Sequence, residues 1–126
     1  MLRDCLVHAT LPVSDLQRAK QFYADKLGLT PADEQPGGLF YAAGGGTRFL
    51  LFPSTGRASG GHTQMGWRVR DIDATVRDLT ERGVIFESYD FDAFDPETRI
   101  ASHGDVRSAW FRDSEGNLLG LVQLPE

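Results

Sequence analysis

Few residues of this 126-residue chain have the type and spacing to do chemistry. His8 could act as a general base, because an unperturbed imidazole titrates near pH ~6.5. It could equally be an inward-facing histidine that hydrogen-bonds a ligand, since the sequence offers it no obvious carboxylate partner. Arg68 could hold an anionic or carbonyl oxygen of a ligand, or pair with an acid such as Glu115. No Ser-His-Asp, Cys-His or paired-carboxylate pattern is recognisable, so these residues favour binding over nucleophilic catalysis.

A repeated strand–helix unit must position these residues. Asp71 follows Asp15 by 56 residues, and the same offset places Gln64 at the position of His8. A repeat at half the chain length predicts two copies of one module. The length suits a single domain. The expected division is one domain, 1–126, with module one at 1–60 and module two at 61–126.

Hydrophobic periodicity outlines the elements of each module. Asp15 and Asp71 are good N-caps for amphipathic helices, and Gly28 and Gly83 are typical helix stops. Alternating or apolar runs predict strands. The acidic segment Asp90–Asp105 has no clear period and is expected to be a loop, either a functional lid or simply solvated. The expected strands are 5–13, 39–43, 48–53, 64–70, 84–89, 106–112 and 118–124, with residues 54–61 as a linker.

This order of elements predicts an α+β fold with two βαβββ modules. Each sheet should have one face covered by its helix, and the other face must find a partner or enclose a cavity. The period of two places His8, Gln64 and Arg68 on the uncovered faces and Trp67 against a helix. Either Trp110 or Phe111 should face the cavity, and the sequence does not decide which.

Composition narrows the function classes. The net charge is −5 and the arginines are scattered, which argues against a nucleic-acid-binding surface. The acidic balance could favour a cationic ligand, although solubility explains it as well. No apolar run reaches the ~20 residues of a membrane span, and no signal peptide is recognisable. With a single cysteine, Cys5, no intrachain disulfide can form, so we expect a cytoplasmic protein without a membrane or nucleic-acid partner.

Three stretches resemble the vicinal oxygen chelate superfamily, also called the glyoxalase/bleomycin resistance/dioxygenase fold. They are LPVSDLQRAKQFYADKLGL at 11–29, GWRVRDIDATVRDLTERGV at 66–84 and AWFRDSEGNLLGLV at 109–122. The third is similar to a closing hairpin that usually reads F-x-D-P-x-G-N, with Ser114 here in place of proline. The resemblance implies cupped sheets around a central cavity, and a homodimer that shares the pocket between its chains.

The resemblance also implies where a metal would bind. Metal-dependent members carry four ligands on the first and last strands of the two modules, and the corresponding residues here are His8, Leu51, Gln64 and Gly120. A divalent ion needs three or four nitrogen, oxygen or sulfur donors. Leu51 and Gly120 provide none. We therefore expect a non-metal member of the superfamily, with no metal and no cofactor.

The function that this implies is sequestration of a small molecule. Non-metal members include bleomycin-resistance-type proteins, which confer antibiotic resistance by binding aromatic or apolar natural products. The alternative is a glyoxalase-like lyase or isomerase that acts on a small carbonyl compound, with His8 as base and Arg68 as the partner of an oxyanion. Whether the protein is an enzyme stays open at this point. The expected ligand-binding residues are His8, Phe49, Leu51, Gln64, Arg68, Trp110 and Gly120.

Overall fold

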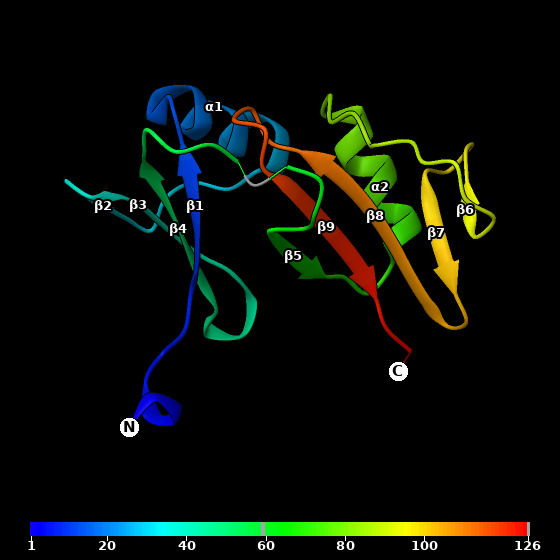
Figure 1. Cartoon of the computed structure of the whole chain (residues 1–126), viewed down its shortest axis with the longest axis horizontal. Coiled ribbons are helices and arrows are strands. Elements are labelled where there is room, and N and C mark those ends of the chain that lie inside the picture. Colours follow the sequence, from blue (N-terminus) through cyan, green and yellow to red (C-terminus); the bar gives the residue numbers. More distant parts are fainter. Residues whose placement is uncertain (59, 126) are drawn as a thin grey trace.

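The computed structural model describes residues 1–58 and 60–125, which form two mixed sheets with one long helix each (Figure 1). The first sheet has the order β1-β4-β3-β2 and the second the order β5-β9-β8-β7-β6. The expected α+β class with two βαβββ-type modules is confirmed. Ser59, in the expected linker, and Glu126 lie outside the described residues.

The elements of module one are β1 (Ala9–Val13), α1 (Leu16–Leu27), β2 (Asp33–Gln35), β3 (Gly38–Ala42) and β4 (Arg48–Pro53), with short 3₁₀ turns at Leu2–Asp4 and Gly44–Gly46. Those of module two are β5 (Met65–Arg68), α2 (Ile72–Glu81), β6 (Phe94–Asp95), β7 (Ile100–His103), β8 (Val106–Arg112) and β9 (Leu118–Gln123).

Both helices begin at the expected caps. The side chain of Asp15 accepts a hydrogen bond from the amide of Arg18, and Asp71 accepts one from the amide of Ala74. Gly28 ends α1 with φ of 70°, in the left-handed region that glycine adopts readily. Each helix is amphipathic as expected, and its buried residues are Ala19 and Tyr23 in α1 and Ile72, Val76 and Leu79 in α2.

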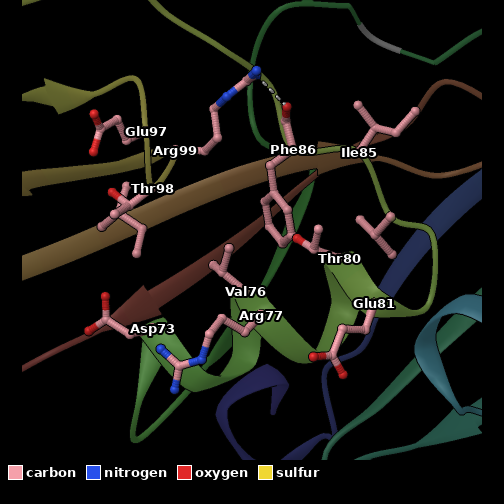
Figure 2. Close-up of a pocket in the computed structure, with 12 residues that line it drawn as sticks. Asp73, Val76, Arg77, Thr80, Glu81, Ile85, Phe86, Glu97, Thr98 and Arg99 are labelled. Carbon is pink, nitrogen blue, oxygen red and sulfur yellow. Dashed lines mark hydrogen bonds between the residues drawn. The ribbon is translucent and has the colours of Figure 1, made fainter.

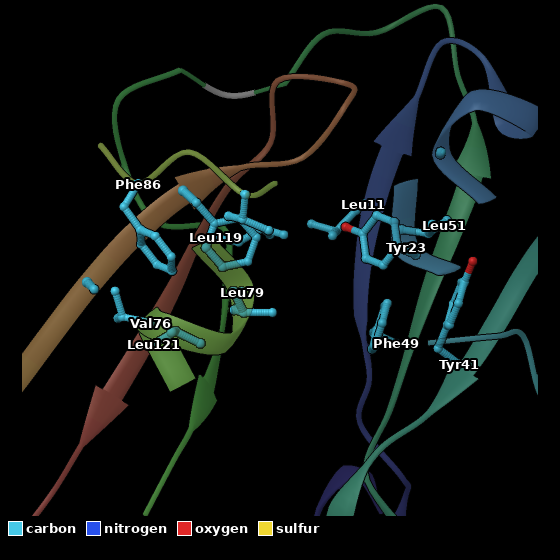
Figure 3. Packing of buried hydrophobic residues seen from close by; sticks show 14 of the residues in the cluster. Leu11, Tyr23, Tyr41, Phe49, Leu51, Val76, Leu79, Phe86, Leu119 and Leu121 are labelled. Carbon is cyan, nitrogen blue, oxygen red and sulfur yellow. The ribbon is translucent and has the colours of Figure 1, made fainter. Parts of the chain in front are cut away.

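Each sheet has one face in the core and one face free of its own helix. Leu11 pairs with Leu51 across β1 and β4, and Ala109 pairs with Leu121 across β8 and β9. All four are buried and belong to one cluster that spans both modules (Figure 3). We call the opposite face of each sheet its open face. Along β4, for example, residues of the open face alternate with the buried ones.

The closing turn of module two fastens the two modules together. Glu115 accepts hydrogen bonds from the amides of Ser14 and Asp15, at 3.1 and 2.9 Å, and from the guanidinium of Arg18. These donors lie at the N-terminus of α1, where unpaired amides favour an anion. Asp113, in the same turn, accepts a hydrogen bond at 2.8 Å from the hydroxyl of Tyr23 in α1. The F-x-D-S-E-G-N stretch is therefore a clamp between the modules.

Two expected strands differ in the structure. β1 begins only at Ala9, since residues 2–4 form a 3₁₀ turn, and Leu6 is 93% exposed on an arm that leaves the body (Figure 1). Cys5, on the same arm, is consequently exposed. Residues 84–89 form no strand beyond a single bridge from Phe86 to Phe111.

The acidic segment 90–105 is not the structureless loop that was expected, because it contributes β6 and β7. These short strands add to the far edge of the second sheet. Among the described residues, no helix is long and apolar enough to cross a membrane.

Candidate functional site

The open face of the first sheet is apolar, and His8 and Arg48 lie at one end of it. The ring of His8 lies edge-on to Phe40, with 5.6 Å between centroids, and the guanidinium of Arg48 lies 5.8 Å from the same ring. Leu50 pairs with both Thr10 and Phe40, so it shares this face. Leu50 and Phe40 are only half-buried. His8 thus lies on the expected face, but in the residue just before β1 begins.

Two of the expected ligand-binding residues lie on the other face. Leu51 is 0% exposed and Phe49 is 3% exposed, and both lie in the core, where Phe49 stacks on Tyr41 (Figure 3). Their placement on a cavity wall is wrong by one residue of register. The reason is that Leu51 pairs with Leu11, which already faces the core. Leu50 and Phe52 hold the positions that the sequence interpretation gave to Phe49 and Leu51.

The open face of the second sheet brings together the expected residues of module two. Gly120 pairs with Trp110 on one side and with Gly66 on the other. Arg68 follows on the same face, exposed to solvent. Trp110 occupies this face, whereas its neighbour Phe111 is fully buried against the helix, so the choice between the two is settled. Gln64 lies at the edge of this face, where its backbone amide donates a hydrogen bond to the carbonyl oxygen of Leu118.

Trp110 is held as a fixed platform. Its Nε1 donates to the Oγ1 of Thr63 at 2.9 Å. A Cβ added to Gly120 would come within 3.2 Å of the Thr63 methyl group and 3.5 Å of the indole ring. Glycine at position 120 therefore leaves the space that the indole and Thr63 occupy.

A cavity of about 380 Å³ opens beside this platform. Its wall includes Tyr89, whose ring meets Trp110 edge-on with 5.5 Å between centroids, and Phe91, which is 40% exposed. The remaining rings continue outward, since Phe94 contacts both Tyr89 and Phe91, and His103 stacks on Phe91. The lining residues are Gly61, His62, Thr63, Tyr89, Phe91, Trp110 and Leu118.

Burial and charge act on Tyr89 in this wall. Its pKa is raised, first by burial and then by the nearby carboxylate of Glu87. The phenol is therefore neutral at physiological pH and can donate a hydrogen bond. Sequence reasoning missed Tyr89, Phe91 and Phe94 as site residues, although the run YDFDAF already showed aromatic side chains at alternate or nearby positions in an acidic segment.

The structure separates the remaining sequence-derived candidates. His8 contacts Phe40 and the carbonyl oxygen of Ala9, both in module one, and does not line the aromatic cavity. The suggested pairing of Arg68 with Glu115 is wrong, because Glu115 binds Arg18 at 2.8 Å. Arg68 remains on the open face, where it could meet a ligand or a second chain.

The residues at the four expected ligand positions do not supply enough donor atoms for a divalent metal ion. On the open faces, Leu50 and Phe52 flank the position expected for one carboxylate, and Gly120 takes the other beneath the indole. His8 and Gln64 alone fall short of three or four donors. In residues 1–58 and 60–125 there is no group of three or more His, Cys, Asp and Glu residues that could hold a metal ion.

The absence of a bound metal stays a prediction that elemental analysis can check. We expect dialysed protein to hold far less than one equivalent of Zn, Ni, Fe or Mn per chain, because two of four positions lack donor atoms. A value close to one equivalent would contradict this.

A second hollow lies on the helix-covered side of the second sheet, between α2 and the turn at 96–99 with the start of β7 (Figure 2). Its volume is about 650 Å³ and its floor includes Val76, Phe86 and Ile100. Arg99 closes one end by donating to the carbonyl oxygen of Phe86 at 3.0 Å. It has no aromatic platform, and its charged rim carries both signs.

Comparison with known proteins decides the family. A sequence profile described as the Glyoxalase/Bleomycin resistance protein/Dioxygenase superfamily matches residues 6–121. The chain belongs to this superfamily. The resemblance seen in the sequence is thereby confirmed. No protein of curated function matches the chain.

Several solved structures share the fold across nearly the whole chain. UcmS2 is 22% identical with a TM-score of 0.72, and the match covers 94% of this chain and 96% of that one. TnmS3, an antibiotic binding protein from Streptomyces sp. CB03234, is 27% identical with a TM-score of 0.65, covering 96% and 98%. A lactoylglutathione lyase from Agrobacterium tumefaciens is 20% identical with a TM-score of 0.65, covering 94% and 92%. A binding protein and an enzyme are thus both similar to this chain in fold.

Proposed function

We propose that this protein binds and sequesters a planar aromatic or apolar natural product, and so acts in antibiotic resistance in the cytoplasm. The observation that carries the proposal is the Trp110 platform, fixed by Thr63 and Gly120 beside the rings of Tyr89 and Phe91. A pre-organised aromatic wall binds flat ligands at a smaller ordering cost than a mobile one. The antibiotic binding protein TnmS3 among the similar structures supports the same function.

The proposal includes a homodimer in which the open face of one chain's first sheet covers the open face of its mate's second sheet. Phe40, Leu50 and Phe52 are half-buried in the single chain and form an apolar surface. A two-fold contact would cover this surface in both chains at once. The ligand would then be enclosed between the aromatic cavity and the partner's apolar face.

Replacement of Trp110 tests the proposed site. Trp110→Leu should weaken the binding of aromatic antibiotics about 10- to 100-fold, because it removes the platform's area and its stacking. Thr63→Val should weaken binding less, since the indole stays but loses its fixing hydrogen bond. The matched control is Trp67→Phe, which alters a tryptophan on the core side of the same sheet.

Isothermal titration calorimetry against a panel of aromatic antibiotics measures these affinities. Equal affinities for the wild type and Trp110→Leu, with both proteins folded by circular dichroism, would refute this site. A loss of binding in Trp67→Phe as large as in Trp110→Leu would mean that the effect is one of stability.

A further inference from the structure

Arg112 ends β8 two residues after Trp110, so both side chains lie on the open face of the second sheet. Across the strand pair, Arg112 faces Leu118 of β9, which lines the aromatic cavity. The guanidinium itself stays outside the cavity wall that the described residues form. Arg112 therefore borders the proposed ligand site without lining it.

The guanidinium of Arg112 joins three segments that are far apart in the sequence. Its Nε donates to a carboxylate oxygen of Glu87 at 3.0 Å, and one terminal nitrogen donates to the carbonyl oxygens of Gly60 at 3.2 Å and Gly116 at 3.0 Å. Two of these acceptors belong to the backbone, so the bonds fix the course of the chain and not only a side chain. The planar fork of an arginine holds such donors in set directions.

Each of the three segments carries part of the cavity or of the contact between the modules. Gly60 directly precedes residues 61–63, which line the cavity. Glu87 lies two residues before Tyr89, which lines it as well. Gly116 belongs to the closing turn that clamps module two to the start of α1. One side chain thus ties two parts of the cavity wall to a turn that is itself anchored.

The end of the linker is attached to β8 at two points. Trp110 donates to the hydroxyl of Thr63 at 2.9 Å, and Arg112 donates to the carbonyl oxygen of Gly60, three residues earlier. Both bonds come from the open face of the same strand. Residues 60–63 are therefore held at both ends, and the hydroxyl that fixes the indole is itself kept in place.

We propose that Arg112 is the positioning residue of the aromatic cavity, because it holds Gly60 and Glu87 beside β8 and so fixes the surroundings of Trp110 before a ligand arrives. The inference rests on the proposed sequestering function and adds to it how the site is kept ordered. A wall that is already ordered in the free protein need not be ordered when the ligand binds, so the loss of Arg112 should appear as a loss of affinity.

Arg112→Met retains an unbranched apolar side chain and removes all three hydrogen bonds. It should weaken the binding of acridone, a neutral planar probe, about 3- to 10-fold, because the linker must then be ordered as the probe binds. Arg112→Lys keeps the charge but not the fork, so its affinity should fall between those of the wild type and Arg112→Met. The matched control is Arg107→Met, which breaks the ion pair with Asp73 from the same strand and should leave acridone binding unchanged.

Fluorescence of the free protein separates positioning from a general loss of stability. In the Trp67→Phe background Trp110 is the sole tryptophan of the chain. There, Arg112→Met should increase the quenching of Trp110 by acrylamide and add a nanosecond component to its anisotropy decay. Arg107→Met should change neither, whatever it does to the midpoint of urea unfolding.

A double-mutant cycle shows whether Arg112 acts through the linker. Combining Arg112→Met with Thr63→Val should weaken acridone binding by less than the product of the two single effects, because either change alone frees the same segment. Single effects that simply multiply would overturn the positioning role, as would unchanged quenching and anisotropy of Trp110 in Arg112→Met. Acridone binding by the wild type would in either case still support the proposed function. If acridone does not bind the wild type while Arg112→Met loosens Trp110, the proposed binding of planar aromatics fails and the positioning role stands.

Discussion

Leu51→Arg is expected to leave no folded protein, whereas the same change at the adjacent Leu50 is expected to leave the fold intact. Leu51 is 0% exposed and lies between Leu11 and Leu39, its partners on the two neighbouring strands. An unpaired arginine there would cost more than about 5 kcal/mol, which rivals the whole stability of a small domain.

Leu50 is half-buried and faces away from the core, so an arginine there can reach solvent. Leu50→Arg should keep the wild-type circular dichroism spectrum but break the proposed dimer, because it puts charge into the apolar open face. Light scattering should then give a mass near 13.9 kDa for the variant, against about twice that for the wild type. Folded Leu51→Arg protein would contradict the register, and a dimeric Leu50→Arg variant would contradict the proposed contact.

Glu115→Gln is expected to lower the free energy of unfolding by about 3 kcal/mol. The guanidinium of Arg18 and the amide of Asp15, together with two hydroxyl groups, hold the pKa of Glu115 down to about 2, although burial opposes this. Its side chain is 1% exposed. A carboxyl whose pKa falls from 4.5 to about 2 on folding stabilises the folded state by about 3 kcal/mol near neutral pH. Glutamine would turn an NH₂ group toward donors that need an acceptor.

The pH dependence has a definite sign. Because the pKa of Glu115 is lower in the folded state, its stabilisation is complete above the ordinary pKa of 4.5 and is lost as pH falls towards about 2. The wild type should lose stability over that range, and Glu115→Gln should lose less. Urea unfolding at one fixed protein concentration is the measurement, since a dimer's stability depends on concentration.

The control for Glu115 is Glu34→Gln, which breaks the exposed pair with Lys20. Exposed pairs contribute ~0–1 kcal/mol, so Glu34→Gln should change the unfolding free energy little. Equal destabilisation by the two variants would show that Glu115 does not stabilise the contact between the modules. A wild type whose stability is flat between about pH 5 and about pH 2.5 would show the same.

The local features of this fold could be predicted from the sequence, while the register and the start of β1 could not. Asp15, Asp71 and Gly28 act on residues within one helical turn, so their roles follow from the sequence. The face of Leu51 depends on which residue of β1 pairs with it, and a shift by one residue turns every side chain over. The 3₁₀ turn at Leu2–Asp4 interrupts an alternating pattern that otherwise favours a longer strand.

The candidate site was half predictable for a similar reason. Gly120 could be assigned to the cavity face from the resemblance, but the sequence left open whether Trp110 or Phe111 shares that face. Only the structure relates the missing side chain of Gly120 to the indole beside it. Tyr89 and Phe91 lie in a segment without period. The bridge from Phe86 to Phe111 and the hydrogen bond from the backbone amide of Glu87 to the carbonyl oxygen of Trp110 hold the start of this segment beside β8. Such contacts are long-range, so local pattern does not encode them.

Recovery of the ligand after binding tests the central claim most directly. A ligand that quenches Trp110 fluorescence in the Trp67→Phe background should be incubated with the protein, released by denaturation and identified by mass spectrometry. Sequestration predicts stoichiometric, chemically unchanged ligand, with affinity in His8→Gln reduced by no more than an ordinary hydrogen bond of ~0.5–1.5 kcal/mol. A recovered ligand that is chemically altered, with the alteration lost in His8→Gln, would contradict sequestration and establish an enzyme.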